Sequence, residues 1–281
     1  MNATSLLTPL FATFVAALVA SCSGPAPLYP PPEAPAELAG RQHATDSGAT
    51  HELEARPAHL RVSMTRVALA EGRVLGLAVP PCEELIAVSL GGDARVMDAQ
   101  APAPSLRVGP GIALRVAGPT NLTASGRGAV MFARVDARPV ACAHRGAFGE
   151  LDLARAPVFV NNPAPPNAAP KPGLRVQLVV EGTAEGPAAG SLAFLEAPPP
   201  LGIPEHTHEG SAEALYVTGG TGTMGLRDEA VNIGGLTTVY VPAGDKHSLL
   251  LSGTEPLRAI QIYAPSGPEQ RFRAGSPLLP R

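Results

Sequence analysis

The chain has 281 residues, of which 45% are hydrophobic and 16% are charged, and its formal net charge is −3. There is no basic surplus to neutralise phosphates, Trp is absent and aromatic residues make up only 4%, so we expect no nucleic-acid partner. Thirty Gly and thirty-two Pro residues interrupt helices and favour short strands joined by turns, which predicts an all-β protein.

The N-terminus carries an apolar run, from Leu6 to Ala20, that ends in the sequence VASC at Cys22. The run is short for a membrane span and has small residues before the break, which predicts a signal peptide over residues 1–21. The four residues VASC resemble a bacterial lipobox, although the first ten residues of the chain contain no Lys or Arg. This resemblance implies that Cys22 is lipidated and becomes the mature N-terminus. The alternative is an ordinary cleaved signal in which Cys22 is incidental.

Residues 22–58 form a polar, Pro-rich stretch. Such a segment buries too little apolar area to offset the entropy lost on ordering, so we interpret it as a tether that holds the folded part off a surface. Together with the lipobox resemblance, it implies a lipid-anchored protein of the cell envelope, at the outer membrane or facing the periplasm. The membrane is therefore an expected partner through the lipid.

The rest of the chain contains an apparent repeat. The sequence ELIAVSLGG at Glu84 is similar to EALYVTGG at Glu213, and further strand and Gly-turn patterns follow both in the same order. A duplication predicts two tandem β-domains, whereas the alternative is that any two Gly- and Pro-rich β-halves look alike. The expected divisions are a first domain at 59–150, a linker at 151–171, a second domain at 172–273 and a tail at 274–281.

The second domain carries the strongest chemical signal. His206 and His208 stand two residues apart in an expected strand, so both imidazoles point to the same face. Glu213 follows, and the sequence PAGDKH supplies a third imidazole at His247. Three neutral imidazoles and a carboxylate suit one divalent transition metal, namely Mn, Fe, Co, Ni, Cu or Zn. An isolated His-x-His would more often be a pair of surface residues in a loop.

These spacings resemble the two motifs of the cupin superfamily, with Gly220 and Pro242 at family positions. The resemblance implies two tandem cupin-type, jelly-roll β-barrels, the second of which holds a metal through His206, His208, Glu213 and His247. Leu251 stands where the family often has Asn, which would make the pocket less polar than usual.

The first domain keeps a Glu at the corresponding position, Glu84, but not the His residues. Leu77 and Val79 stand where the His pair would be, and Leu122 or a neighbour stands in place of the third His. We therefore expect a degenerate cupin barrel that binds no metal by this scheme. In that barrel Glu84 would be only a surface or rim carboxylate.

Cys82 and Cys142 both lie in the first domain. In an exported protein they could be joined by a disulfide, and two separate buried thiols are an equal alternative. The sequence does not decide between them.

Three functions fit the site: an enzyme acting on a small molecule, such as a metal-dependent dioxygenase or isomerase, a non-catalytic binding module, or a structural envelope protein. Strand alternation predicts an apolar pocket for a hydrophobic or aromatic molecule, with polar contacts from the last strand. The cations near the motifs are too few for a sugar phosphate. Catalytic residues are unassigned, and the oligomeric state is open. The expected pocket residues are Leu215, Val217, Leu249, Leu251, Gln261 and Tyr263, and the cations are Arg227, Lys246 and Arg258.

Overall fold

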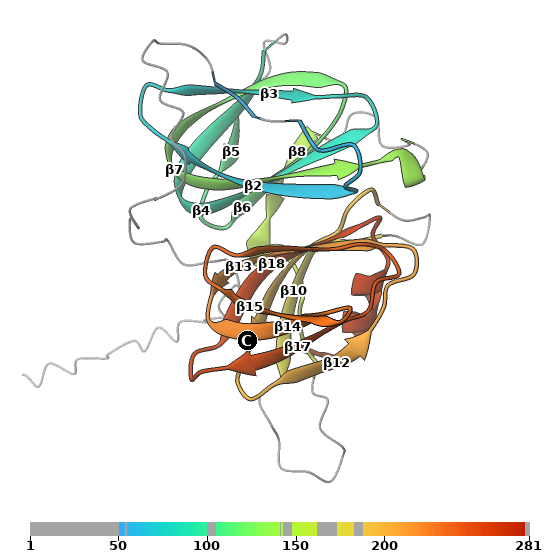
Figure 1. Ribbon diagram of the computed structural model, residues 1–281. Helices are drawn as coiled ribbons and strands as arrows, with labels where there is room; N and C mark the ends of the chain where they lie inside the picture. The colour runs from blue at the N-terminus through green and yellow to red at the C-terminus, as the bar shows by residue number, and fades with distance from the viewer. Residues whose placement is uncertain are drawn as a thin grey trace, which may run out of the picture.

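The computed structural model describes residues 51–53, 55–99, 105–140, 142, 148–161, 173–182 and 188–278. These residues form two β-barrels in tandem, the first blue to green and the second orange to red in Figure 1. The expectation of an all-β protein is confirmed. Within the described ranges no helix has the length and apolar character needed to cross a bilayer. The predicted signal peptide, Cys22 and most of the predicted tether lie outside these ranges.

The first barrel is built around two long antiparallel strands, β4 and β7, which bend so that each takes part in both sides of the barrel. At the bend a Cβ on Gly128, whose φ is +128°, would lie 1.9 Å from the carbonyl oxygen of Gly91, so only glycine fits. Strands β2 and β6 join one half of this pair, and β3 and β5 join the other. The strands are β1 (His51–Glu52), β2 (Val62–Leu69), β3 (Val74–Val79), β4 (Glu83–Asp98), β5 (Leu106–Val108), β6 (Ile112–Ala117), β7 (Thr120–Asp136) and β8 (Phe148–Asp152).

The second barrel has one sheet in the order β16-β13-β18-β11-β10-β9-β19 and a facing sheet in the order β12-β17-β14-β15. The turn between β13 and β14 contains Gly220, where φ is +76° and a Cβ would lie 2.4 Å from the carbonyl oxygen of Pro256. The strands are β9 (Val158–Asn161), β10 (Leu174–Val180), β11 (Leu192–Ala197), β12 (Gly202–His206), β13 (Ala212–Gly219), β14 (Thr221–Leu226), β15 (Glu229–Gly234), β16 (Thr238–Val241), β17 (His247–Ser252), β18 (Leu257–Ala264) and β19 (Ser276–Leu278).

The pairing pattern of the two barrels is the same. Strand β4 pairs with β6 and β7 as β13 pairs with β16 and β18. The repeat read from the sequence therefore corresponds to a repeated topology. The two glutamates differ in facing, however, because Glu213 alternates with Leu215 and Val217 of the second barrel's own core, whereas Glu84 alternates with Ile86 and Val88 of the core between the barrels.

The barrels pack together through a shared apolar core. Side chains from β2, β4 and β7 of the first barrel meet side chains from β11, β13 and β18 of the second in one buried cluster. Figure 1 shows β13 and β18 on the side of the second barrel that faces the first. This burial joins the two halves by the hydrophobic effect. Representative members are Val62, Val88, Met131, Phe194, Tyr216 and Ile260.

The ordered core extends beyond the domain limits expected from the sequence. In the expected tether, β1 pairs with β3, Leu53 is buried and Arg56 makes ion pairs with the first barrel. In the expected linker, β9 pairs with β10, so it belongs to the second barrel, and β19 of the expected tail pairs with β9. The Pro-rich surroundings concealed these short strands, whose pairing depends on distant partners.

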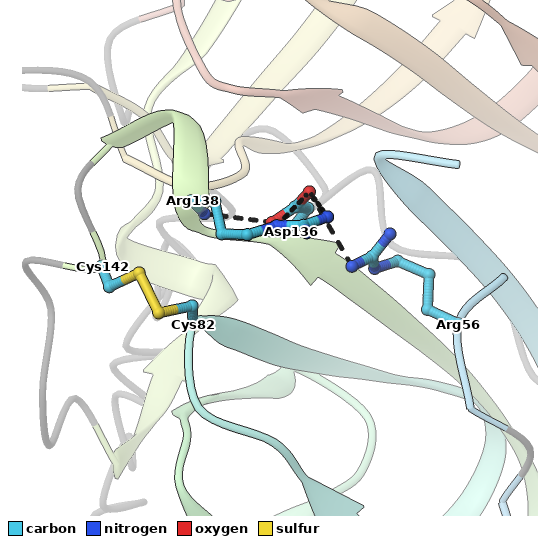
Figure 2. Close-up of a disulfide and its surroundings, with 5 residues drawn as sticks. All are labelled: Arg56, Cys82, Asp136, Arg138 and Cys142. Carbon is cyan, nitrogen blue, oxygen red and sulfur yellow. Dashed lines mark hydrogen bonds and ion pairs between the residues drawn. A yellow bond between two sulfur atoms is a disulfide. The ribbon is translucent and has the colours of Figure 1, made fainter. Parts of the chain in front are cut away.

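A disulfide joins Cys82, at the start of β4, to Cys142, just after the short 3-10 helix η1 (Arg138–Val140). Of the two alternatives left by the sequence, the structure has the bonded pair. Asp136 lies beside this bridge and accepts hydrogen bonds from Arg138, as Figure 2 shows. These bonds, with a smaller contribution from the charge of Arg56, hold the pKa of the Asp136 carboxyl below its usual value of 3.8.

Buried ion pairs close the same end of the first barrel. Arg134 donates to Glu83 at 2.8 Å and to the carbonyl oxygen of Ala78 at 2.7 Å, and both charged side chains are buried. Glu84 is also buried, at 1% exposed, and accepts two hydrogen bonds from Arg115. The interpretation of Glu84 as a surface or rim carboxylate is therefore wrong. A buried carboxylate needs such a partner, and Arg115 lies on the neighbouring strand.

Candidate metal centre

The four predicted ligands come from three strands and from the loop that follows one of them, at one end of the second barrel. His206 ends β12, His208 lies in the turn that follows, Glu213 is the second residue of β13, and His247 begins β17. Strands β12 and β17 are paired so that His206 lies directly opposite His247. Sheet pairing therefore brings together residues that are 41 positions apart in the sequence.

The three imidazole rings form a compact cluster. Ring centroids are 4.2 Å apart for His206 and His247, 4.9 Å for His206 and His208, and 5.0 Å for His208 and His247. Their ligating nitrogens all lie within 4.8 Å of one another. Within the described part of the chain, no other group of three His, Cys, Asp or Glu side chains converges in this way.

Backbone carbonyls orient two of the rings. His206 Nδ1 is 2.9 Å from the carbonyl oxygen of Pro204, and His247 Nδ1 is 3.1 Å from that of Asp245. With the Nδ1 hydrogen directed at the backbone, Nε2 of each ring is the atom turned toward the cluster, where a metal would replace any hydrogen on it. His208 Nε2 is buried and has no hydrogen-bond partner among the described residues, as expected of an atom that faces an ion.

Glu213 supplies a buried carboxylate to this cluster. Its Oε2 lies 3.1 Å from His247 Nε2 and 3.4 Å from His208 Nε2. Burial would raise the pKa of Glu213, but its contacts with His208, His247 and Gln261 outweigh that effect and hold the pKa well below 4.5. The side chain is therefore a carboxylate anion at neutral pH.

Gln261 and Tyr263, on β18, face the same interior. Gln261 Nε2 donates to Glu213 Oε1 at 2.6 Å and to the Tyr263 hydroxyl at 2.9 Å. The opposite amide orientation would set two oxygens 2.6 Å apart, so the nitrogen points at the carboxylate. The ring of Tyr263 lies edge-on to His208 with centroids 4.9 Å apart. Burial raises the pKa of Tyr263 well above 10, and the negative charge of Glu213 adds to the effect, so its hydroxyl stays protonated.

The apolar residues expected to line a pocket lie in the packed interior of the barrel. Leu215, Val217 and Leu251 are buried in its hydrophobic cluster, and Leu249 packs against that cluster. Strand alternation sets Leu215 on the same face of β13 as Glu213, and Leu249 on the same face of β17 as His247. A separate cleft of about 420 Å³ opens beside the turns of β14–β15 and β16–β17, where Arg227, Tyr240 and Lys246 are among its lining residues.

One residue near the centre had no sequence signal. Arg271 lies in the 3-10 helix η3 (Pro268–Ala274), after the last strand of the family pattern, and its Nη2 donates to the Tyr263 hydroxyl at 2.8 Å. The cations named from the sequence lie in other ion pairs. Arg227 pairs with Asp245, Lys246 with Glu205 and Arg258 with Glu196.

The donor set fits a single divalent transition metal. Three imidazoles present nitrogen, one carboxylate presents oxygen, and His208 Nε2 lies 3.4 Å from that carboxylate. The residues that would hold the ion are His206, His208, Glu213 and His247.

Comparisons with known proteins agree with this geometry. Residues 194–263, which contain all four residues, match the cupin domain. No curated protein sequence matches the chain. A structure of oxalate decarboxylase, from work on its substrate binding mode and reaction specificity switch, is similar with a TM-score of 0.52 and 15% identity, covering 74% of this chain and 69% of that one.

Structures of the Bacillus subtilis oxalate decarboxylase are also similar. One, described for its Mn(II) centres, has a TM-score of 0.52, and a single-residue variant has 0.53; both are 15% identical and cover 74% of this chain and 70% of theirs. At this identity the likeness concerns the fold, which is confirmed as two cupin-type barrels in tandem. The domain match concerns the second barrel alone, whereas the likeness to these structures concerns the fold of both barrels. The three His residues that could hold a metal ion all lie within the matched residues.

Proposed function

We propose that the second barrel binds one divalent transition metal through His206, His208, Glu213 and His247, and that a small molecule binds beside it. The observation that carries the proposal is the cluster of three imidazoles, two of whose Nε2 atoms lie within 3.4 Å of one buried carboxylate, with two of the rings oriented by backbone carbonyls. Mn, Fe, Co, Ni, Cu and Zn all accept this donor set.

A bound ion of this kind supplies Lewis-acid or redox chemistry to a small molecule. The chain itself keeps Glu213 ionised, orients it through Gln261 and surrounds the centre with apolar side chains. These features favour an apolar or aromatic substrate and an enzyme of dioxygenase or isomerase type. The second candidates are a non-catalytic metal-dependent binding protein and a structural envelope protein.

In this proposal the first barrel is a degenerate partner without a metal. Leu77 on β3 lies opposite Leu122 on β7, in the strand pair that corresponds to β12 and β17, where His206 lies opposite His247. Both leucines are at most 2% exposed. An apolar pair thus stands where the second barrel has imidazoles.

The proposed location is the cell envelope, with a lipid on Cys22. The disulfide between Cys82 and Cys142 supports it, because such bonds persist in oxidising compartments outside the cytosol. Labelling cells with an alkyne-bearing fatty acid tests the anchor. Wild type should incorporate the label and Cys22→Ala should not, and an unlabelled wild type would refute lipidation.

The metal centre is tested first by elemental analysis of protein purified from its own host. His208→Ala combined with His247→Ala should lose stoichiometric metal, while the exposed control His59→Ala should keep it. Unchanged metal content in the double variant would rule out this site. Oxygen uptake with a panel of aromatic substrates then separates the enzyme from the binding protein. A redox-active metal with substrate-dependent uptake supports the enzyme, and zinc without turnover supports the other candidates.

A further inference from the structure

Gln261 is a buried amide in the apolar interior of the second barrel. On one face of β18 it lies between Ala259 and Tyr263, and on β13 it lies opposite Leu215, which all belong to the hydrophobic cluster of this barrel. The side chain is 4% exposed. Burying an amide in such surroundings costs free energy unless hydrogen bonds replace those made to water. Its hydrogen bonds therefore indicate what the amide does here.

The amide nitrogen of Gln261 is fully used. It lies 2.6 Å from Oε1 of Glu213 and 2.9 Å from the hydroxyl of Tyr263. Because an amide nitrogen carries two hydrogens, these two bonds fix the plane of the amide. The hydroxyl is itself held from the C-terminal 3-10 helix, since it also accepts a bond from Arg271. The nitrogen is thereby kept against one oxygen of the Glu213 carboxylate.

The amide oxygen of Gln261 contrasts with the nitrogen. It is buried and has no hydrogen-bond partner among the residues that the structure describes. A buried acceptor left unpaired costs about 1–3 kcal/mol. Turning the amide over would set two oxygens 2.6 Å apart, so the nitrogen stays on Glu213 although the oxygen remains unpaired. The contact with the carboxylate is therefore what the amide contributes.

The two oxygens of Glu213 have different surroundings. Oε2 faces the imidazoles, 3.1 Å from Nε2 of His247 and 3.4 Å from Nε2 of His208. Oε1 accepts the short hydrogen bond from Gln261, and bonds to a charged acceptor are stronger than neutral ones. Using both oxygens for an ion among the imidazoles would require the carboxylate to turn and to lengthen that bond. The hydrogen bond thus makes the two oxygens unequal before any ion binds.

We propose that Gln261 is a positioning residue of the metal centre, which holds Oε1 of Glu213 and so limits this carboxylate to one metal bond, through Oε2. The inference rests on the proposed function, because it needs an ion at the His cluster. Partners that hydrogen-bond to a ligating side chain orient it, and losing them typically costs about 10–100-fold in metal affinity. A carboxylate that uses one oxygen occupies one coordination position instead of two. The position that remains is available to the small molecule.

Infrared difference spectra of the full-length protein, with zinc minus without zinc, test the inference. The asymmetric and symmetric stretches of a carboxylate lie far apart when one oxygen binds a metal and closer together when both do. We expect a wide separation in wild type, from a pair of bands that Glu213→Gln removes, and a narrow separation in Gln261→Met. Methionine is similar in length but has no N–H donor, so the zinc affinity of Gln261→Met should also fall about 10–100-fold. Tyr263→Phe keeps the ring, removes the acceptor of the second N–H and should narrow the separation in part.

Gln177→Met is the matched control, because Gln177 is also buried in the same sheet but its amide donates to the carbonyl oxygen of Leu153. This variant can lose stability, yet its spectrum and zinc affinity should equal those of wild type. A narrow separation in wild type would overturn the inference while leaving the metal site standing. So would an unchanged separation in Gln261→Met, or in Tyr263→Phe should Gln261→Met fail to fold. Wild type that retains no zinc would instead overturn the proposed function.

Discussion

Replacing Glu213 by Gln isolates its role as a ligand from its role in the fold. The side chain is 5% exposed, and the variant keeps its size and its contact with Gln261 while losing the charge. In metal-free protein the new amide donates toward Nε2 of His247, 3.1 Å from the present carboxylate oxygen. Some stability is still lost without metal, because the fold favours the ionised carboxylate, so the effect on binding is measured as the difference between scans with and without metal. Metal affinity should fall at least 100-fold, because even groups that only support a ligand are worth 10–100-fold.

The expected loss follows from mass action. At a free metal concentration about 1,000 times the wild-type Kd, binding stabilises the fold by about 4 kcal/mol, and a 100-fold weaker site retains about 1.4 kcal/mol. The metal-induced rise in Tm should then fall by roughly two thirds, because Tm changes by about 2–4 °C per kcal/mol in a chain of this size. Calorimetric scans with and without zinc measure the effect. A variant with the full wild-type rise would show that Glu213 is no ligand.

Three further predictions concern the first barrel. Replacing Cys82 and Cys142 by Ala should lower the free energy of unfolding by about 4 kcal/mol, because the bond closes a loop with a separation of 60 residues; urea unfolding equal to that of wild type would contradict this. Arg134→Ala should lower the free energy of unfolding by about 3–5 kcal/mol, because it leaves a buried carboxylate unpaired. Arg107→Ala, at an exposed ion pair, should lower it by less than about 1 kcal/mol, and similar losses in both variants would contradict this reasoning. Because the pKa of Asp136 is lowered in the fold, its contribution is complete above about pH 3.8 and is lost as the pH falls through the lowered value. Asp136→Asn should therefore flatten the acid limb of the stability curve, and an unchanged limb would exclude this contribution.

The two barrels share a topology, but their corresponding strands carry different side chains. In the second, an end of the barrel is polar and gathers imidazoles, while in the first the corresponding strands meet through leucines. In the first barrel the buried charged groups are instead the ion pairs of Glu83 and Glu84, next to the disulfide. Because the barrels share one apolar core, a change in the first can alter the stability of the second without touching its centre.

The sequence by itself determined the strand-rich class, the repeated order and the three His residues that come together. Gly and Pro act on the local backbone conformation, and the spacings around His206 and His247 follow a pattern that can be read along the chain. Short-range alternation also placed Gln261 and Tyr263 on one strand.

Only the tertiary structure decided what depends on distant partners. Strand β9 forms because β10 and β19 pair with it, Glu84 is buried because Arg115 lies on the adjacent strand, and Cys82 reaches Cys142 through the fold. Arg271 is the clearest case, because its position beside Tyr263 comes from the path of the chain after the last barrel strand. Residue type and spacing encode local geometry, whereas such contacts exist only once the strands have packed.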